Sequence, residues 1–131
     1  MKSVLVSLVI VFVTVLAPLK SEASTQNEIY LRDDLILQLL EPQLSIELEH
    51  HFGGTTQYNC AQILRIKKAE AGSYLFTVDV QVITFEGPHN PPNYIVNMTF
   101  SNSGPDWKWR IMKFKSTPLD TNQKIPCRDP L

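Results

Sequence analysis

The sequence contains little glycine, few cysteines and no excess of charge of either sign. Its 131 residues include five glycines and two cysteines, and 12 basic against 13 acidic side chains leave a net charge of −1. Two cysteines are too few for a disulfide-dense miniprotein, and a charge this close to zero excludes a basic nucleic-acid-binding domain. A chain of this length supports one hydrophobic core, which excludes an array of several domains.

Long hydrophobic runs are also absent, except at the front of the chain. The stretch from Val4 to Ala17 has no charge, follows Lys2 and precedes a small-x-small triplet that ends at Ala23. This pattern is typical of a secretory signal peptide, so we expect residues 1–23 to be cleaved off after Ala23. The run is shorter than the roughly 18 to 20 residues that span a bilayer, which makes an uncleaved membrane-anchoring helix the alternative.

The two cysteines, Cys60 and Cys127, both follow the predicted cleavage position. An even pair in an exported chain suggests one disulfide. On the loop-entropy model, a bridge over this separation stabilises the fold by about 4 kcal/mol. The alternative is a pair of reduced thiols, and a metal site built from these two distant residues alone is not expected.

Residues 27–52 carry apolar side chains with the spacing of a helix. Ile29 and Leu37 support a main stripe that recurs every fourth residue. The stripe consists of Ile36, Leu40, Leu44, Leu48 and Phe52. Pro42 lacks the amide hydrogen of an interior helical residue, so it predicts a kink or the start of a second helix. The Gly53-Gly54 pair predicts the end of the segment, because glycine adopts the left-handed conformation common there.

After this helix the period of the apolar residues becomes two, as in a β-strand. Strands are predicted at residues 61–68, 74–85, 94–101 and 107–115. The core face of the second strand carries Tyr74, Phe76, Val78, Val80 and Val82, and that of the third carries Tyr94, Val96, Met98 and Phe100. The alternation in the fourth strand slips between Ile111 and Met112, which predicts a β-bulge. Residues 116–131 contain three prolines and are predicted to be irregular unless Cys127 holds them.

One helix followed by four strands predicts an α+β fold in which the helix packs on an antiparallel meander. Cystatin-like and nuclear-transport-factor-like domains have this plan. We expect a single domain at residues 24–115 and an irregular tail at residues 116–131. The fold class by itself implies no function.

The meander predicts which end of the sheet carries the chemistry. Successive hairpins close at opposite ends, so the connection at residues 86–92 lies opposite the other two. We call its side the basal end, and the predicted helix must also finish there. His50, His51, His89 and Cys60 are therefore expected at one end, together with the start of the tail that holds Cys127.

The connection at residues 86–92 is rich in proline, and its Pro88, Pro91 and Pro92 each fix a φ angle. We expect a stiff, wide loop that holds Glu86, His89 and Asn90 in place for recognition; the alternative is a structural corner that covers the open end of the core.

Imidazole and carboxylate groups at the basal end also permit acid–base chemistry or metal binding by Glu86 and His89, with His50 or His51 nearby. Two observations weaken that hypothesis. Adjacent histidines on a helix point about 100° apart, and the favourable interaction of histidine with a helix C-terminus explains the pair equally well. The sequence contains no HExxH motif, no glycine-rich phosphate loop and no nucleophile motif, so we expect no metal and no cofactor.

The run from Thr84 to Tyr94, TFEGPHNPPNY, is the most distinctive in the chain. With the strand that ends at Phe100, it resembles the signature of domain-of-unknown-function family 3888, small exported proteins of spore-forming Gram-positive bacteria. The resemblance covers about residues 33–114 and departs from the family pattern at Asn93, which stands before Tyr94. It implies export but no activity and no catalytic residue.

Together these observations predict a secreted or cell-envelope protein that is a non-enzymatic binding or structural module. Its expected binding residues are Glu86, His89, Asn90, His50 and His51, and its expected partner is an unidentified envelope or extracellular component rather than a nucleic acid. Contact with a membrane is expected only through an uncleaved signal segment. The alternative function is a small hydrolase or metal-binding protein that uses Glu86 and His89.

Overall fold

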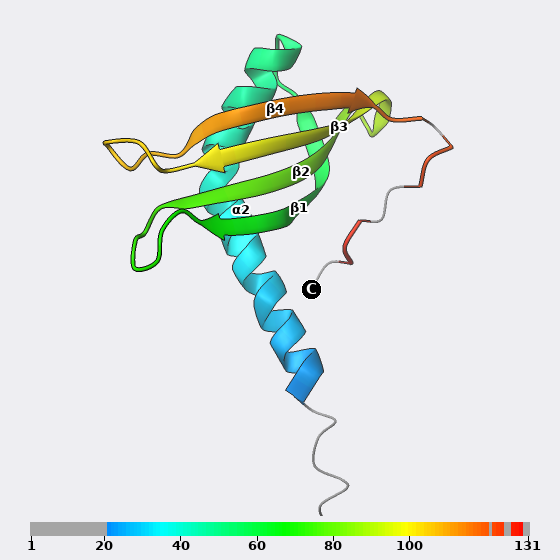
Figure 1. Ribbon diagram of the computed structural model, residues 1–131. Helices are drawn as coiled ribbons and strands as arrows, with labels where there is room; N and C mark the ends of the chain where they lie inside the picture. Colours follow the sequence, from blue (N-terminus) through cyan, green and yellow to red (C-terminus); the bar gives the residue numbers. More distant parts are fainter. Residues whose placement is uncertain (1–20, 121, 125–126, 130–131) are drawn as a thin grey trace, which may run out of the picture. The chain divides into compact units, whose positions relative to one another are not determined.

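The computed structural model describes residues 21–120, 122–124 and 127–129, so residues 1–20 of the predicted signal peptide lie outside it. One helix is followed by four strands (Figure 1). The elements are α2 (Ser21–Phe52), β1 (Gln57–Lys68), β2 (Phe76–Glu86), β3 (Asn90–Ser101) and β4 (Arg110–Pro118). The strands pair antiparallel in the order β1-β2-β3-β4, which confirms the α+β meander. Within the described residues, no helix is long and apolar enough to cross a membrane.

The chain divides into two compact units, residues 1–32 with residue 131, and residues 33–130. The described part of the first unit is the beginning of α2, where Arg32 forms an exposed ion pair with Glu28 at 3.5 Å. Ile29 is 43% exposed there, so its expected place in the buried stripe is wrong. The second unit contains the sheet and the remainder of the helix.

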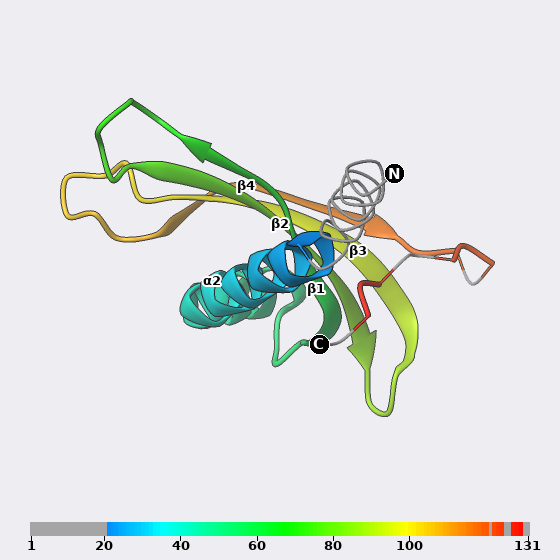
Figure 2. The same ribbon diagram turned by 90° about the horizontal axis from the view of Figure 1, so that it is seen from below.

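From residue 33 onwards, α2 packs across one face of the sheet (Figure 2). Leu40, Leu44 and Leu48 are almost fully buried against residues of β2 and β3, as the fourfold spacing predicts. Their partners in this core are Val78, Val80, Val82, Val96, Met98 and Phe100. The helix continues through exposed Pro42, so no second helix begins there.

The faces of the strand interiors agree with the prediction, whereas strand ends differ from it. Tyr74 is 73% exposed and lies before β2, so its expected place on the core face is wrong. β1 begins at Gln57, four residues before the predicted start. β4 begins at Arg110 rather than Trp107, because the chain turns at Trp107, whose φ is 58°. Trp107 is therefore exposed and only Trp109 packs against the core. Thr99 pairs with Lys113 while Phe100 pairs with Ile111, which leaves Met112 unpaired and confirms the predicted bulge.

The sheet face opposite the helix carries a network of polar side chains. Gln62 donates to Gln81, and Gln81 donates to Asn97, each at 2.9 Å. Beside this amide ladder, Asp79 accepts hydrogen bonds from Arg65 at 2.8 Å and from Thr99 at 2.7 Å. Polar groups that bond across three adjacent strands hold the strand register on this face.

The C-terminal tail is irregular but attached to the domain at two points. A disulfide joins Cys60 to Cys127, with their Cα atoms 5.1 Å apart, which confirms the predicted bridge. Next to it, Arg128 forms an ion pair with Asp34 of α2. Both attachments lie in the second unit and hold the tail against the domain.

Candidate functional site

The basal end is built around the hairpin between β2 and β3. Glu86 pairs with Asn90, so the turn itself contains only the three residues between them. The wide loop predicted for residues 86–92 is therefore wrong. Pro91 and Pro92 belong to β3, where they stand with Asn93 at a register shift between two paired positions. Proline is tolerated at such a bulge because the ladder needs no amide donor there.

The turn has a tight backbone conformation. Gly87 has a φ of 51° and His89 a φ of 64°, both in the left-handed region, and the His89 amide donates to the Gly87 carbonyl at 2.9 Å. Glycine adopts this conformation without steric cost, whereas histidine does so less often. The sequence therefore closes this hairpin over very few residues.

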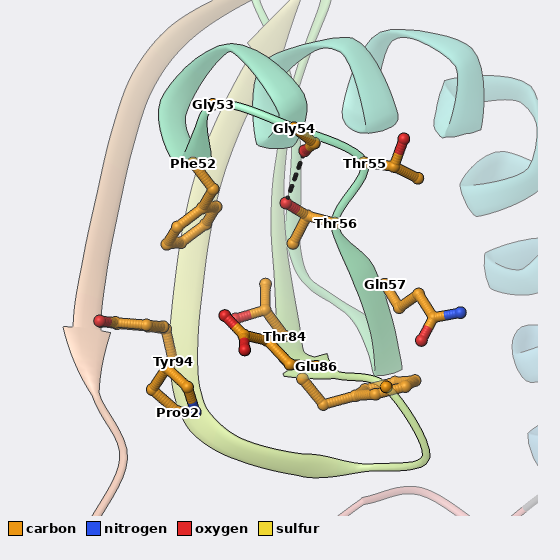
Figure 3. Close-up of a pocket in the computed structure, with 12 residues that line it drawn as sticks. Phe52, Gly53, Gly54, Thr55, Thr56, Gln57, Thr84, Glu86, Pro92 and Tyr94 are labelled. Carbon is orange, nitrogen blue, oxygen red and sulfur yellow. Dashed lines mark hydrogen bonds between the residues drawn. The ribbon is translucent and has the colours of Figure 1, made fainter.

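A pocket of about 420 Å³ opens between this hairpin and the end of α2 (Figure 3). Three segments line it: the helix end with its connection to β1, the end of β2 with the turn, and the start of β3. Its lining residues are Phe52, Gly53, Gly54, Thr55, Thr56, Gln57, Thr84, Phe85, Glu86, Gly87, Pro92 and Tyr94. The volume lies in the range typical of small-molecule sites.

Local structure keeps the helix side of the pocket open. The helix ends at Phe52, and the next residue, Gly53, has a φ of 79° and donates its amide to the Glu49 carbonyl at 2.8 Å. Left-handed glycine is a common helix terminator. The following residues cross to β1 as a short connection, and the Thr56 hydroxyl donates to the Gly54 carbonyl at 3.0 Å. Small side chains here leave room that larger ones would fill.

One wall of the pocket is aromatic. The rings of Phe52 and Tyr94 have centroids 5.2 Å apart, and both side chains are half-buried against the edge of the core. Figure 3 shows Thr84 and Glu86 extending from β2 toward the space between these rings and Thr56. Apolar walls with a few polar groups directed inward are typical of ligand sites.

The pocket has one formally charged group. Glu86 is exposed, and the other eleven lining residues include no aspartate, lysine, arginine or histidine. Thr56, Thr84 and Gln57 supply the neighbouring hydrogen-bonding side chains. The lining therefore favours a ligand that brings positive charge or hydrogen-bond donors.

The structure does not gather the three histidines around Glu86. The His89 ring stacks on Phe85 at 4.1 Å and its Nδ1 lies 3.5 Å from Asn59 Nδ2. His51 stacks on Phe114 and lies 3.1 Å from the Ser116 hydroxyl. Neither ring belongs to the pocket lining.

The remaining predicted residues lie around this end, outside the pocket lining. His50 is exposed on the helix, and Asn90 is exposed at the start of β3. Within the described part of the chain, no group of three or more histidine, cysteine, aspartate or glutamate side chains could hold a metal ion. Of the five predicted binding residues, Glu86 alone lines the pocket.

The sequence-based prediction missed the aromatic wall and the threonines. One signal could have found part of them: the core-facing positions of β2 alternate, so the series through Val78, Val80 and Val82 continues to Thr84 and Glu86. These two residues extend the helix-facing side of the strand past the apolar core. Nothing comparable in the sequence places Phe52 beside Tyr94, because they belong to different elements.

The fold and the pocket define a class of protein: a small α+β domain with one helix on a four-stranded meander and a pocket at its basal end. The chain belongs to the family described as "Protein of unknown function (DUF3888)", whose model matches residues 32–117. No curated protein and no solved structure matches the chain. The family assignment confirms the resemblance carried by the Thr84–Tyr94 run.

Proposed function

We propose that this protein is a non-enzymatic binding module that acts outside the cell or at its envelope, in a spore-forming Gram-positive bacterium. Its N-terminal segment directs export, and the pocket at the basal end receives part of an envelope or extracellular partner. The observation that carries this proposal is the pocket, where an aromatic wall and one carboxylate face a common space.

Rigidity of the pocket walls supports a role in recognition. Glu86 stands at the end of a paired strand, next to a three-residue turn, while Phe52 and Tyr94 pack against the core. A site whose backbone is held by strand pairing and core packing loses little backbone freedom when the ligand arrives. A site assembled from strand ends and a helix terminus is thus organised for binding without a large rearrangement.

The same geometry favours binding over hydrolysis. A hydrolase that used Glu86 and His89 would need both groups within hydrogen-bond reach of one reacting atom or water. His89 stacks on Phe85 and does not line the pocket, whereas Glu86 does. We therefore assign Glu86 to ligand contact and His89 to support of the hairpin.

A variant that adds a bulky side chain to the pocket lining tests this function. A Cβ placed on Gly54 meets no atom within 4 Å, so Gly54→Trp adds an indole to this lining position without a clash at its Cβ. We expect it to keep the melting temperature but to weaken retention of the full chain on isolated envelopes of the source organism by about tenfold or more, which corresponds to about 1.4 kcal/mol.

The matched control is Ala71→Trp, which adds the same side chain to the exposed β1–β2 hairpin at the opposite end of the sheet. It should leave retention unchanged. If Gly54→Trp were retained as well as the unmodified chain, the pocket would not be the binding site and the proposal would fail.

A further inference from the structure

We propose that the basal pocket binds a primary ammonium group carried on an aliphatic chain, as in a lysine side chain. This inference rests on the proposed function, in which the pocket is the binding site. It begins with charge, because Glu86 is the single formally charged side chain in the lining. An anion would face this carboxylate without any cationic partner, and a purely apolar group would desolvate the carboxylate without compensation.

The aromatic wall adds a second contribution of the same sign. Aromatic rings attract a cation placed over their faces within about 6 Å of the centroid. Phe52 and Tyr94, with centroids 5.2 Å apart, border the space into which Glu86 extends. In Figure 3 the hydroxyl of Tyr94 points away from Glu86, so it is not one of the polar groups directed at the space beside the carboxylate.

The hydrogen-bond acceptors match an ammonium group. An ammonium group has three donors and no acceptor. The Glu86 carboxylate and the Thr84 hydroxyl come from β2, whereas the Thr56 hydroxyl comes from the connection on the other side of the pocket. Thr56 donates its hydrogen to the Gly54 carbonyl, which leaves its oxygen lone pairs available to accept.

The acceptors come from two separate elements, β2 and the connection between α2 and β1, and this spread is why we choose ammonium over guanidinium. A planar guanidinium prefers two parallel acceptors on one carboxylate, whereas an ammonium is a compact charge whose donors diverge. Acceptors on two separate elements suit the diverging donors. The aliphatic chain of the ligand then lies against Phe52, Tyr94 and Pro92, in a space large enough for four methylene groups.

The experiment compares two matched probes on the full chain, Nα-acetyl-lysine amide and Nα-acetyl-norleucine amide. They differ only in the terminal ammonium group. Binding is followed by NMR through the backbone amides of Gly54, Thr56 and Glu86. We expect the lysine probe to bind about 5- to 30-fold more tightly than the norleucine probe.

Glu86→Gln removes the charge and keeps the shape of the side chain. It should weaken binding of the lysine probe several-fold and leave a preference over norleucine of at most about 5-fold, which is the share of the aromatic rings. The control is Glu70→Gln, which neutralises an exposed carboxylate in the β1–β2 hairpin at the opposite end of the sheet and should leave the lysine preference intact.

Three results would overturn this inference: equal affinity for both probes, a lysine preference that Glu86→Gln leaves undiminished, and tighter binding of Nα-acetyl-arginine amide than of the lysine probe. Each of these leaves the proposed function standing if Gly54→Trp still weakens envelope retention. Normal retention of Gly54→Trp, by contrast, removes the proposed function itself.

Discussion

The two faces of α2 allow a prediction with its own internal control. Leu44 is 1% exposed and lies among the buried side chains of β2 and β3, whereas Leu39, five residues earlier on the same helix, is 68% exposed. Both residues are leucines in one continuous helix. Changing each to alanine therefore separates the effect of burial from the effect of the substitution itself.

The expected costs follow from what each side chain contacts. Leu44→Ala removes buried methyl groups and leaves a cavity in the core, which costs about 3–4 kcal/mol of unfolding free energy. Leu39→Ala removes little buried surface, and alanine favours helix slightly more than leucine does, so its cost is within about 0.5 kcal/mol. The two variants should therefore differ by about 3 kcal/mol.

Urea unfolding of the full chain measures this difference. With a slope of about 1–3 kcal/mol/M, the midpoint should fall by about 1–3 M for Leu44→Ala and should hardly move for Leu39→Ala. Circular dichroism and tryptophan fluorescence, to which Trp109 contributes from its place against the core, should report the same midpoint if unfolding is two-state. Equal losses for the two variants would refute the helix orientation described above.

Two further predictions concern the covalent and electrostatic links of the domain. Replacing Cys60 and Cys127 by serine should cost about 4 kcal/mol, and reduction of the unmodified chain should lower its urea midpoint to the same value; a loss below about 1 kcal/mol would contradict the loop-entropy argument. Asp79→Asn should cost about 1–2 kcal/mol at pH 7, because it weakens charged hydrogen bonds from Arg65 and Thr99. Burial by itself raises the pKa of Asp79, but these hydrogen bonds and the nearby cationic charges outweigh it and hold the pKa below the ordinary value of 3.8. The stabilisation that ionised Asp79 contributes is therefore present above that value and is lost as the pH falls through the lower folded-state pKa. The difference in unfolding free energy between the unmodified chain and Asp79→Asn should therefore be smaller at pH 3 than at pH 7. Urea unfolding measures this difference. If it were equal at both pH values, the ionised form of Asp79 would not be the source of the stabilisation.

Features that depend on local geometry could be predicted from the sequence. The fourfold spacing of Leu40, Leu44 and Leu48 and the alternation in β2 and β3 identify the core, because helix and strand periods are properties of the backbone. The slip beside Met112 likewise predicted a bulge that the register confirms. The order of the hairpins predicted that the helix end and the β2–β3 turn lie at one end, and residues of both line the same pocket.

Positions that depend on several elements could not be predicted in this way. Thr84 and Glu86 follow the alternation of β2. Whether they line the same pocket as Phe52 and Tyr94 depends on where the helix ends over the sheet. The separation of His51 from His89 has the same cause, because one packs on β4 and the other on the β2–β3 hairpin.

Two of the five glycines shape the pocket in the structure. Gly53 ends the helix and Gly87 turns the hairpin, both in the left-handed region, and both line the pocket. The sequence by itself determined the periods of the elements and the pairing order that follows from short connections. The tertiary structure alone decided which side chains share the pocket, because that depends on how the helix end, the β2–β3 turn and the start of β3 approach one another in space.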